Sequence, residues 1–219
     1  MDQVDRHMYK KDKERCTLVD LPWNPFVAGI INALDDPKNL YLLTEFIPCG
    51  SLRDIIQHRR NDEPLAAREA AFYFCNIIEG ISFLHDEGVI HRDLKPDNIL
   101  VGQDGYLVIT DFGTVAKLGE PEADWKDVGT RFYTAPELDL LDGNSTIGKA
   151  GEDPMDRYSV DTYSAGVILF EMLTRRLVRF LSPTLERLNN PFDLITYTSL
   201  FLELLQGTCS SRSIMDQQA

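Results

Sequence analysis

The stretch His91-Arg92-Asp93-Leu94-Lys95-Pro96-Asp97-Asn98 places an acid, a cation and an amide in one short loop, and Asp111-Phe112-Gly113 follows it. A carboxylate at Asp93 can accept the proton of an attacking hydroxyl, and Lys95 can neutralise charge on a phosphate in transfer. Asn98 and Asp111 supply hard oxygen ligands of the kind that Mg²⁺ prefers. These residue types in this order indicate phosphoryl-transfer chemistry.

Two further motifs lie downstream. Residues 129–137 read Gly-Thr-Arg-Phe-Tyr-Thr-Ala-Pro-Glu, and residues 161–167 read Asp-Thr-Tyr-Ser-Ala-Gly-Val. Together with the His-Arg-Asp-Leu-x-x-x-Asn loop and Asp-Phe-Gly, and in the same order, they resemble the catalytic domain of eukaryotic Ser/Thr protein kinases, above all the AGC group. The resemblance implies an α+β, protein-kinase-like fold with a mostly helical C-lobe and, here, a partial N-lobe.

Length and charge limit the choice of partners. The chain has 219 residues, long enough for one large domain or two small ones, and its hydrophobic content of 43% suits a globular protein with a core. Its formal net charge is −13. Nucleic acids and anionic membranes bind basic surfaces, so neither is expected as a partner. A basic peptide or protein is compatible with this charge.

The cysteines point to a reducing compartment. Cys16, Cys49, Cys75 and Cys209 are scattered, without the spacing of a metal site, which is typical of reduced thiols in the cytoplasm or the nucleus. The sequence shows no apolar run long enough to span a bilayer and no signal peptide. We therefore predict a cytoplasmic protein, with the nucleus as the alternative.

The first segment, residues 1–47, is predicted to form the partial N-lobe. Apolar spacing predicts a helix that ends near Pro22, and residues 26–34 and 39–47 are expected to be strands. By resemblance the helix is the αC helix of the family, and Glu14 is then its ion-pairing glutamate. The alternative is that Glu14 is an ordinary surface residue of the helix.

The resemblance has one large gap. The glycine-rich loop that covers the ATP phosphates should precede αC, but the first glycine of this chain is Gly29. The family's strand lysine should also come earlier, before Met1. The expectation is therefore a chain that begins after the first three N-lobe strands, truncated before the αC helix.

The nucleotide site is assigned by resemblance alone. The second strand leads into the hinge, where Thr44 is the gatekeeper and the backbone of Glu45 and Ile47 faces the adenine edge. Leu100 forms the floor under adenine. The alternative is that these are ordinary strand residues.

The rest of the chain, residues 48–219, is predicted to form the C-lobe. Apolar periodicity predicts helices over 66–86 and 161–173, and Asp104-Gly105 between apolar runs predicts a hairpin of residues 99–101 and 106–109. Ser51 is a candidate helix N-cap. Residues near 138–159, rich in Asp, Gly and Pro, are expected to be a surface insertion. Further predictions are a short helix over 200–206 and a structural pair of Arg212 with Glu137.

The resemblance also assigns the catalytic residues. Asp93 positions and deprotonates the acceptor hydroxyl, Lys95 stabilises the transferring charge, and Asn98 and Asp111 hold magnesium. Thr130 is expected against Asp93 and Lys95, which is consistent with Ser or Thr as the acceptor. His91 is expected to pack near Phe112, as a structural residue and not as an acid or base, and Asp161 to cap the backbone of the catalytic loop.

Loop phosphorylation is in doubt. Between Gly113 and Gly129 the sole hydroxyl side chain is Thr114, and the position of an AGC-type phosphothreonine is occupied by Lys126. Arg92, which by resemblance binds an activation-segment phosphate, is then expected to pair with Asp124 or Asp127. The alternative is that the segment needs no ordering charge.

The resemblance suggests a preference for basic substrates. Asp97 and Glu171 match two carboxylates with which basophilic kinases bind a substrate arginine, whereas a third such position is Ser51. The alternative for Glu171 is a solvent-exposed helix charge.

The sequence thus predicts a serine/threonine protein kinase domain that uses ATP and Mg²⁺ to phosphorylate a protein. The alternative is a catalytically impaired kinase remnant that acts as a binding or scaffold protein, because the phosphate-covering loop and its lysine are missing. Small-molecule phosphotransferases of the aminoglycoside type share the acid-to-Asn spacing, but they lack Ala-Pro-Glu and its associated substrate loop.

Overall fold

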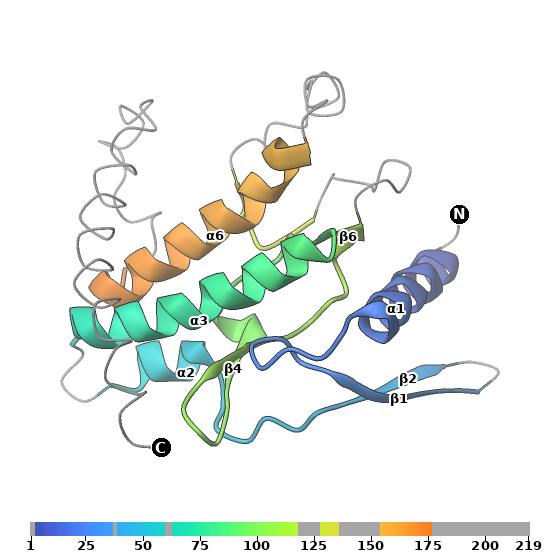
Figure 1. The fold of residues 1–219 in the computed structure, drawn as a ribbon, viewed down its shortest axis with the longest axis horizontal. Coiled ribbons are helices and arrows are strands. Elements are labelled where there is room, and N and C mark those ends of the chain that lie inside the picture. The colour runs from blue at the N-terminus through green and yellow to red at the C-terminus, as the bar shows by residue number, and fades with distance from the viewer. Residues whose placement is uncertain (1–2, 37–38, 60–62, 118–127, 136–153, 177–219) are drawn as a thin grey trace, which may run out of the picture.

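The structure is a computed structural model that describes residues 3–36, 39–59, 63–117, 128–135 and 154–176. Figure 1 shows helix α1 (Gln3–Asp20) beside the hairpin of strands β1 (Ile30–Asp35) and β2 (Leu40–Thr44) on one side of the molecule. The remaining helices and short strands lie on the other side. The domain boundary at residue 47 stays a prediction.

The strands of the hairpin are shorter than predicted. Residues 26–29 are outside β1 because their backbone pairs elsewhere: Ile109 N–H donates to the Phe26 carbonyl at 2.8 Å, and Ala28 N–H donates to the Ile109 carbonyl at 2.9 Å. Strand β2 ends at Thr44, and Glu45 N–H still reaches the Gly29 carbonyl at 3.2 Å. The first segment of the chain is thereby tied to the strand that leads into Asp-Phe-Gly.

Two long helices pack against each other at the centre of the second part. Helix α3 (Ala67–Asp86) matches the predicted helix, and α6 (Pro154–Thr174) starts earlier than predicted. The prediction of a surface insertion reaching residue 159 is therefore wrong for residues 154–159. Proline at the first helical position has a suitable φ and lacks an N–H that would stay unpaired there, so Pro154 begins the helix rather than ending a loop.

Short elements carry the site residues. Helix α2 (Leu52–Gln57) begins at the predicted N-cap Ser51, which forms a capping box with Asp54. Strands β4 (Ile99–Val101) and β5 (Leu107–Ile109) form the predicted antiparallel hairpin, and the 3-10 helix η2 (Pro96–Asn98) precedes β4. Strands β3 (Val89–Ile90) and β6 (Ala116–Lys117) form a second short antiparallel pair.

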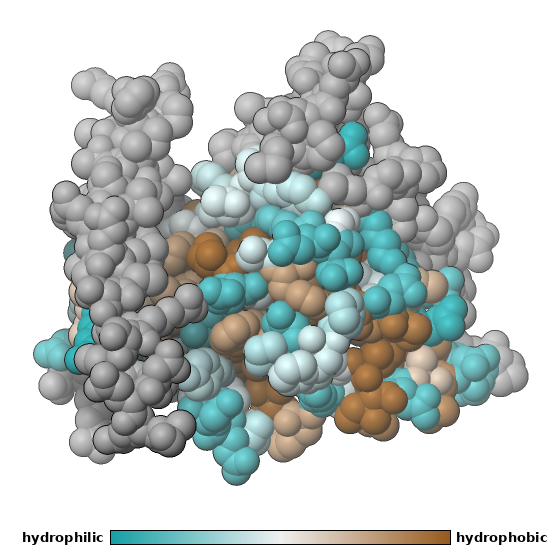
Figure 2. Space-filling model, viewed as in Figure 1, coloured by the Kyte–Doolittle hydropathy of each residue, from teal (hydrophilic) through white to brown (hydrophobic). Residues whose placement is uncertain are grey.

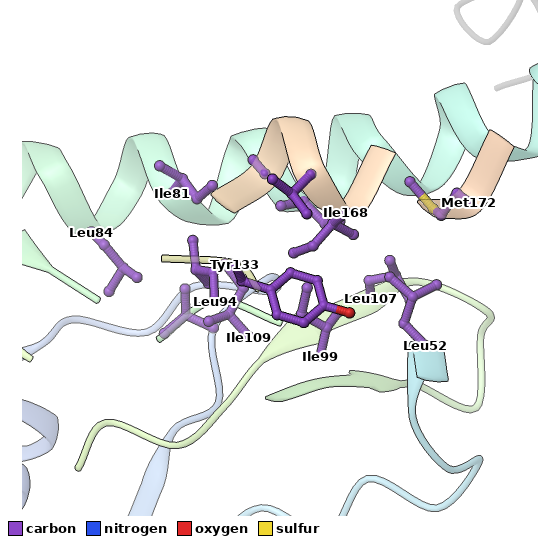
Figure 3. Packing of buried hydrophobic residues seen from close by; sticks show 14 of the residues in the cluster. Leu52, Ile81, Leu84, Leu94, Ile99, Leu107, Ile109, Tyr133, Ile168 and Met172 are labelled. Carbon is purple, nitrogen blue, oxygen red and sulfur yellow. The ribbon is translucent and has the colours of Figure 1, made fainter. Parts of the chain in front are cut away.

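The core lies between the two long helices and the β4–β5 hairpin. Figure 3 shows side chains from α3 and α6 packing onto side chains from the hairpin, the catalytic loop and α2. Fully buried members of this cluster include Leu52, Leu84, Leu94, Ile99, Leu107, Ile109, Ile168 and Met172. The catalytic loop therefore rests on this buried cluster.

The β1–β2 hairpin exposes apolar side chains. Ile31, Leu34, Tyr41 and Leu43 each expose more than half of their surface, and Figure 2 shows apolar surface over this region at the lower right. Within the described ranges, no helix has both the length and the apolar character needed to cross a lipid bilayer. Cys16, Cys49 and Cys75 are free thiols.

Candidate active site

Asp93 is the hub of the candidate active site. Its Oδ1 accepts a hydrogen bond from the Thr130 hydroxyl at 2.7 Å, and its Oδ2 accepts one from Lys95 Nζ at 2.7 Å. Lys95 Nζ also donates to the Thr130 hydroxyl oxygen at 2.9 Å, which closes a triangle of acid, cation and hydroxyl. Asn98 Nδ2 donates to the Asp93 carbonyl at 3.0 Å. The structure brings together the four residues that were predicted to be catalytic.

Asp161 of α6 holds the backbone that leads into Asp93. Its two carboxylate oxygens accept hydrogen bonds from the backbone N–H groups of His91 and Arg92, both at 2.8 Å, and its side chain is fully buried. Arg92 has a φ of 68°, which lies in the left-handed region that side chains disfavour. The predicted role of Asp161 as a cap of the loop backbone is confirmed.

His91 is a packed residue, as predicted. It is fully buried, and its ring lies 5.5 Å from the Phe112 ring between centroids. Its Nδ1 accepts a hydrogen bond from Asp93 N–H at 3.3 Å, so the ring proton belongs on Nε2, which donates to the Thr110 carbonyl at 3.0 Å. Both ring nitrogens are thus engaged in holding backbone, which gives His91 a structural role.

The ends of the β4–β5 hairpin place Asn98 and Asp111 near each other. Ile99 pairs with Ile109, and Thr110 N–H donates to the Asn98 carbonyl at 2.9 Å. Asp111 follows with an exposed carboxylate and a φ of 65°. The Asn98 amide nitrogen binds Asp93, so its amide oxygen is the atom with which it could ligate a metal.

This donor set fits Mg²⁺. Among the described residues, no three His, Cys, Asp or Glu side chains gather in a group suited to a metal ion. Mg²⁺ does not need such a cage, since it commonly takes one or two protein oxygens and completes its shell with water and phosphate oxygens. Asn98 and Asp111 can supply those two oxygens.

One cleft collects the residues predicted for the nucleotide. It has a volume of about 370 Å³ and lies between α1, the β1–β2 hairpin and the start of the Asp-Phe-Gly segment. Its lining includes all five residues predicted to bind the cofactor: Thr44, Glu45, Ile47, Leu100 and Asp111. The apolar lining comes from both parts of the molecule and includes Leu18, Ala28, Leu42 and Phe112.

The charged lining of this nucleotide cleft is acidic. Glu14, Glu45 and Asp111 line it, whereas no lysine or arginine of the described chain does. Glu14 belongs to α1, and its carboxylate lies beside Gly113, where an added Cβ would be 4.0 Å from Glu14 Oε2. Glu14 therefore lines the cleft, and its role as the ion-pairing glutamate of αC stays a prediction. A bound triphosphate would depend on a cation supplied with it.

Arg92 binds the activation segment through backbone carbonyls. Its Nε donates to the Thr114 carbonyl at 2.6 Å and its Nη2 to the Val115 carbonyl at 3.0 Å. The alternatives for its charge partner, Asp124 and Asp127, lie outside the described residues. The same holds for Lys126, for the predicted helix over 200–206, for the predicted pair of Arg212 with Glu137, and for residues 138–153 of the predicted insertion.

Two residues next to the site were not found by sequence reasoning. Arg53 of α2 and Tyr133 of the activation segment both contact Glu171, and Arg53 also contacts Asp97. Glu171 exposes 5% of its surface, so the alternative of a solvent-exposed helix charge is wrong. Arg53 belongs to no motif, and it meets Glu171 only because α2 and α6 converge. No local signal in the sequence could have paired them.

A family model for the protein kinase domain matches residues 5–197, most of the chain and all of the site described above. The chain belongs to the protein kinase family. This finding agrees with the triangle of Asp93, Lys95 and Thr130 and with the hairpin that joins Asn98 to Asp111.

The kinase is similar to Ser/Thr kinases of the AGC group, as the motifs predicted. It is 34% identical to cGMP-dependent protein kinase 2 of Rattus norvegicus over 69% of this chain and 18% of that protein. It is 32% identical to citron rho-interacting kinase of Rattus norvegicus over 74% of this chain and 8% of that protein. Protein kinase C zeta type of Oryctolagus cuniculus is 32% identical over 79% of this chain and 25% of that protein. The chain thus spans a quarter or less of these relatives.

Proposed function

We propose that this chain is a serine/threonine protein kinase domain that transfers the γ-phosphoryl group of ATP to a Ser or Thr hydroxyl of a protein. Residues 1–47 serve as its partial N-lobe and residues 48–219 as its C-lobe. The family and the Ser/Thr kinases among its relatives support the reaction class.

The hydroxyl of Thr130 is the observation that carries this proposal. It donates to Asp93 Oδ1 and accepts from Lys95, so the site already binds an aliphatic hydroxyl between its acid and its cation. An acceptor hydroxyl held by Asp93 in the same manner would give its proton to the carboxylate as its oxygen forms the new bond to the γ-phosphorus. The bond from that phosphorus to the β–γ bridging oxygen breaks, and ADP leaves.

Positioning of the reactants and electrostatic stabilisation of the transferring phosphoryl group then determine the rate of transfer. Lys95 stands 2.7 Å from Asp93 and can neutralise charge on the phosphoryl group in flight. Asn98 and Asp111 would hold Mg²⁺, which supplies further charge neutralisation for the phosphates. The nucleotide cleft offers Leu100 and Leu42 as apolar surfaces for adenine and the backbone of Glu45 and Ile47 for its polar edge.

Binding of Mg-ATP to the 219-residue chain is the first test. We expect saturable binding by calorimetry and its loss in Asp111→Ala, because that variant removes a metal ligand. Asp86→Ala, an exposed aspartate at the end of α3, is the matched control and should bind as the unaltered chain does.

Transfer is measured separately from binding. Asp93→Asn should keep Mg-ATP binding but lower phosphorylation of a generic protein substrate by about a hundredfold or more, because the proton acceptor is lost. Equal transfer rates in Asp93→Asn and the unaltered chain would contradict the assigned chemistry.

The cleft also favours a second candidate function, a kinase-like binding or scaffold protein with impaired catalysis. No lysine or arginine of the described chain lines the nucleotide cleft, so among the described residues the cleft lining itself offers the phosphates no cation. A well-folded chain that binds no Mg-ATP would exclude the first function for these 219 residues and favour the second.

We further infer the setting of the protein. A net charge of −13 weighs against nucleic acid and anionic membrane as partners and in favour of a protein substrate. The free thiols at Cys16, Cys49 and Cys75 suit the cytoplasm or the nucleus.

A further inference from the structure

Arg53 of helix α2 forms ion pairs with the two carboxylates that were predicted to bind a basic substrate. Its Nε and Nη2 donate to Asp97 Oδ2 at 3.2 and 3.0 Å, and its Nη1 donates to Glu171 Oε1. The Tyr133 hydroxyl accepts from Arg53 Nη2 and donates to the second oxygen of Glu171. Both acids are therefore already bound by a cation of the same chain.

The cluster is largely withdrawn from water. The Arg53 side chain exposes 17% of its surface, and the Glu171 side chain exposes 6%. Burial acts to lower the pKa of Arg53, but the hydrogen bonds with Tyr133 and Asp97 and the charge of Glu171 outweigh it, so the pKa is raised. A buried ion pair is expensive to break, because the remaining charge loses its partner without regaining full hydration.

The cluster lines a second cleft next to the reacting groups. This cleft has a volume of about 360 Å³ and reaches Thr130, the residue that contacts Asp93 and Lys95. Among the residues that the structure describes, its charged lining consists of two acids, Asp97 and Glu171, and two arginines, Arg53 and Arg175. A substrate segment whose acceptor hydroxyl lies at Asp93 would therefore pass a cleft whose described lining has no formal net charge.

We propose that Arg53 is a specificity-determining residue that removes the preference for a basic side chain in the substrate. Resting on the proposed kinase function, the inference names the substrate class: Ser- or Thr-containing segments with an uncharged residue at this second cleft. A substrate arginine would have to displace Arg53 from Asp97 and Glu171 and leave a mostly buried guanidinium without its partners.

Helix α2 makes this displacement difficult. Its first turn is held by the capping box of Ser51 and Asp54, and Leu52 and Ile56 are buried in the core. Arg53 is thus presented from a fixed backbone beside both acids. A tethered group competes at a high effective concentration, so a substrate cation in free solution is at a disadvantage.

Peptide binding tests the proposal without requiring catalysis. The probes are peptides in which Ala replaces the acceptor Ser and a single Arg is placed at varied distances from it, with an otherwise identical Arg-free peptide as reference. Binding is measured by fluorescence anisotropy at low ionic strength. For the unaltered chain we expect Arg-containing and Arg-free peptides to bind within about twofold of each other.

Arg53→Met exposes the acids and keeps the apolar stem of the side chain. We expect at least one Arg-containing peptide to bind this variant about tenfold or more tightly than the Arg-free peptide, as a charge-assisted hydrogen bond allows. Arg53→Lys, which keeps the cation, should show no such preference. The double variant Arg53→Met with Glu171→Gln should lose part of the gained preference.

Asp97→Asn keeps the proposal testable if Arg53→Met does not fold. Asp97 is half exposed, and its substitution leaves Arg53 with a surplus of positive charge. We expect Arg-containing peptides to bind this variant several-fold more weakly than the Arg-free peptide.

Three outcomes would overturn the proposal. They are a tenfold preference for Arg in the unaltered chain, no gain of preference in folded Arg53→Met, and absence of peptide binding in every variant. The predicted binding pattern in a chain that transfers no phosphoryl group would instead support the specificity role and count against the proposed catalytic function alone.

Discussion

At the residue scale, a few buried polar contacts hold the catalytic loop in an unfavourable backbone conformation. Asp161 accepts both loop N–H groups and also contacts His85 Nε2 at 2.9 Å. Its carboxylate is fully buried, so each hydrogen bond replaces hydration that the folded chain cannot provide. Removing one acceptor therefore leaves a buried donor unsatisfied, which costs more than the hydrogen bond itself contributes.

Asp161→Asn should lower the free energy of unfolding by about 2 to 4 kcal/mol, because the amide has one acceptor oxygen where the carboxylate has two. The measurement is urea unfolding followed by circular dichroism. Asp86→Asn, on an exposed position, is the control and should change stability by less than about 0.5 kcal/mol. Equal effects of the two substitutions would contradict the capping role.

Gly129 is required by both its backbone and its surroundings. Its φ is +92°, and an added Cβ would lie 2.8 Å from the Arg92 carbonyl oxygen. Gly129→Ala should cost about 2 to 4 kcal/mol in stability and lower phosphoryl transfer, since it displaces Thr130 from Asp93.

Gly105 in the β4–β5 turn is the matched control for Gly129. Its φ is +85°, but an added Cβ would meet nothing within 4 Å. Gly105→Ala should cost about 1 to 2 kcal/mol from backbone strain alone and leave transfer unchanged. A Gly129→Ala protein as stable and as active as Gly105→Ala would show that the contact with Arg92 does not matter.

At the element scale, helix α3 fixes how closely the first segment of the chain approaches the catalytic hairpin. Gly80 lies where α3 crosses Phe26 and Ile109, and an added Cβ would lie 3.0 Å from the Phe26 carbonyl oxygen and 2.8 Å from Ile109 Cδ1. That carbonyl accepts the Ile109 N–H at 2.8 Å, so it cannot move away without losing a hydrogen bond.

Gly80→Ala tests this close approach, because the sign of the change in the free energy of unfolding shows which of two effects is larger. Helix propensity alone predicts a gain of about 1 kcal/mol for Gly to Ala. Overpacking costs about 1 to 3 kcal/mol and should win, giving a net loss of stability. Adding Ile109→Val, which removes the methyl group at 2.8 Å, should recover part of that loss in urea unfolding. A stabilised Gly80→Ala protein would mean that the backbone at Phe26 moves to make room for the added Cβ.

At the scale of the whole molecule, stability should fall at alkaline pH because several tyrosines are held neutral. Burial raises the pKa of Tyr133, of Tyr73 and of Tyr158, and the charges of Glu171, Glu69 and Asp86, respectively, raise it further. A raised pKa in the folded state means that the unfolded chain ionises first. The contribution of these neutral tyrosines to the free energy of unfolding is therefore complete below about pH 10 and is lost as the pH rises further.

Tyr133→Phe measures the largest part of this effect. Above about pH 10, the free energy of unfolding should fall less steeply with pH in this variant than in the unaltered chain. The expected difference between the two slopes is about 1.4 kcal/mol per pH unit. Tyr106→Phe, at an exposed position of the β4–β5 hairpin, is the control for loss of a tyrosine hydroxyl outside this cluster. Identical slopes for all three proteins would exclude this contribution of Tyr133.

Much of the site could be predicted because its chemistry is local in the chain. Asp93, Lys95 and Asn98 share one loop, and Asp104-Gly105 predicts the hairpin that returns the chain to Asp111. The helix over Ala67–Asp86 follows from apolar periodicity in the same local way. The start of α6 at Pro154 was missed, because a proline after Asp and Gly residues is typical of loops as well as of a first helical turn.

The sequence by itself determined the protein kinase family, the catalytic motifs and the main helices, because each depends on residue types at short, fixed spacings. Only the tertiary structure decided that Arg53 meets Asp97 and Glu171, and that Glu14 and Asp111 line the same nucleotide cleft. These contacts join residues far apart in the chain. Their partners are selected by helix packing and by the cost of burying an unpaired charge, and neither leaves a pattern at any single position of the sequence.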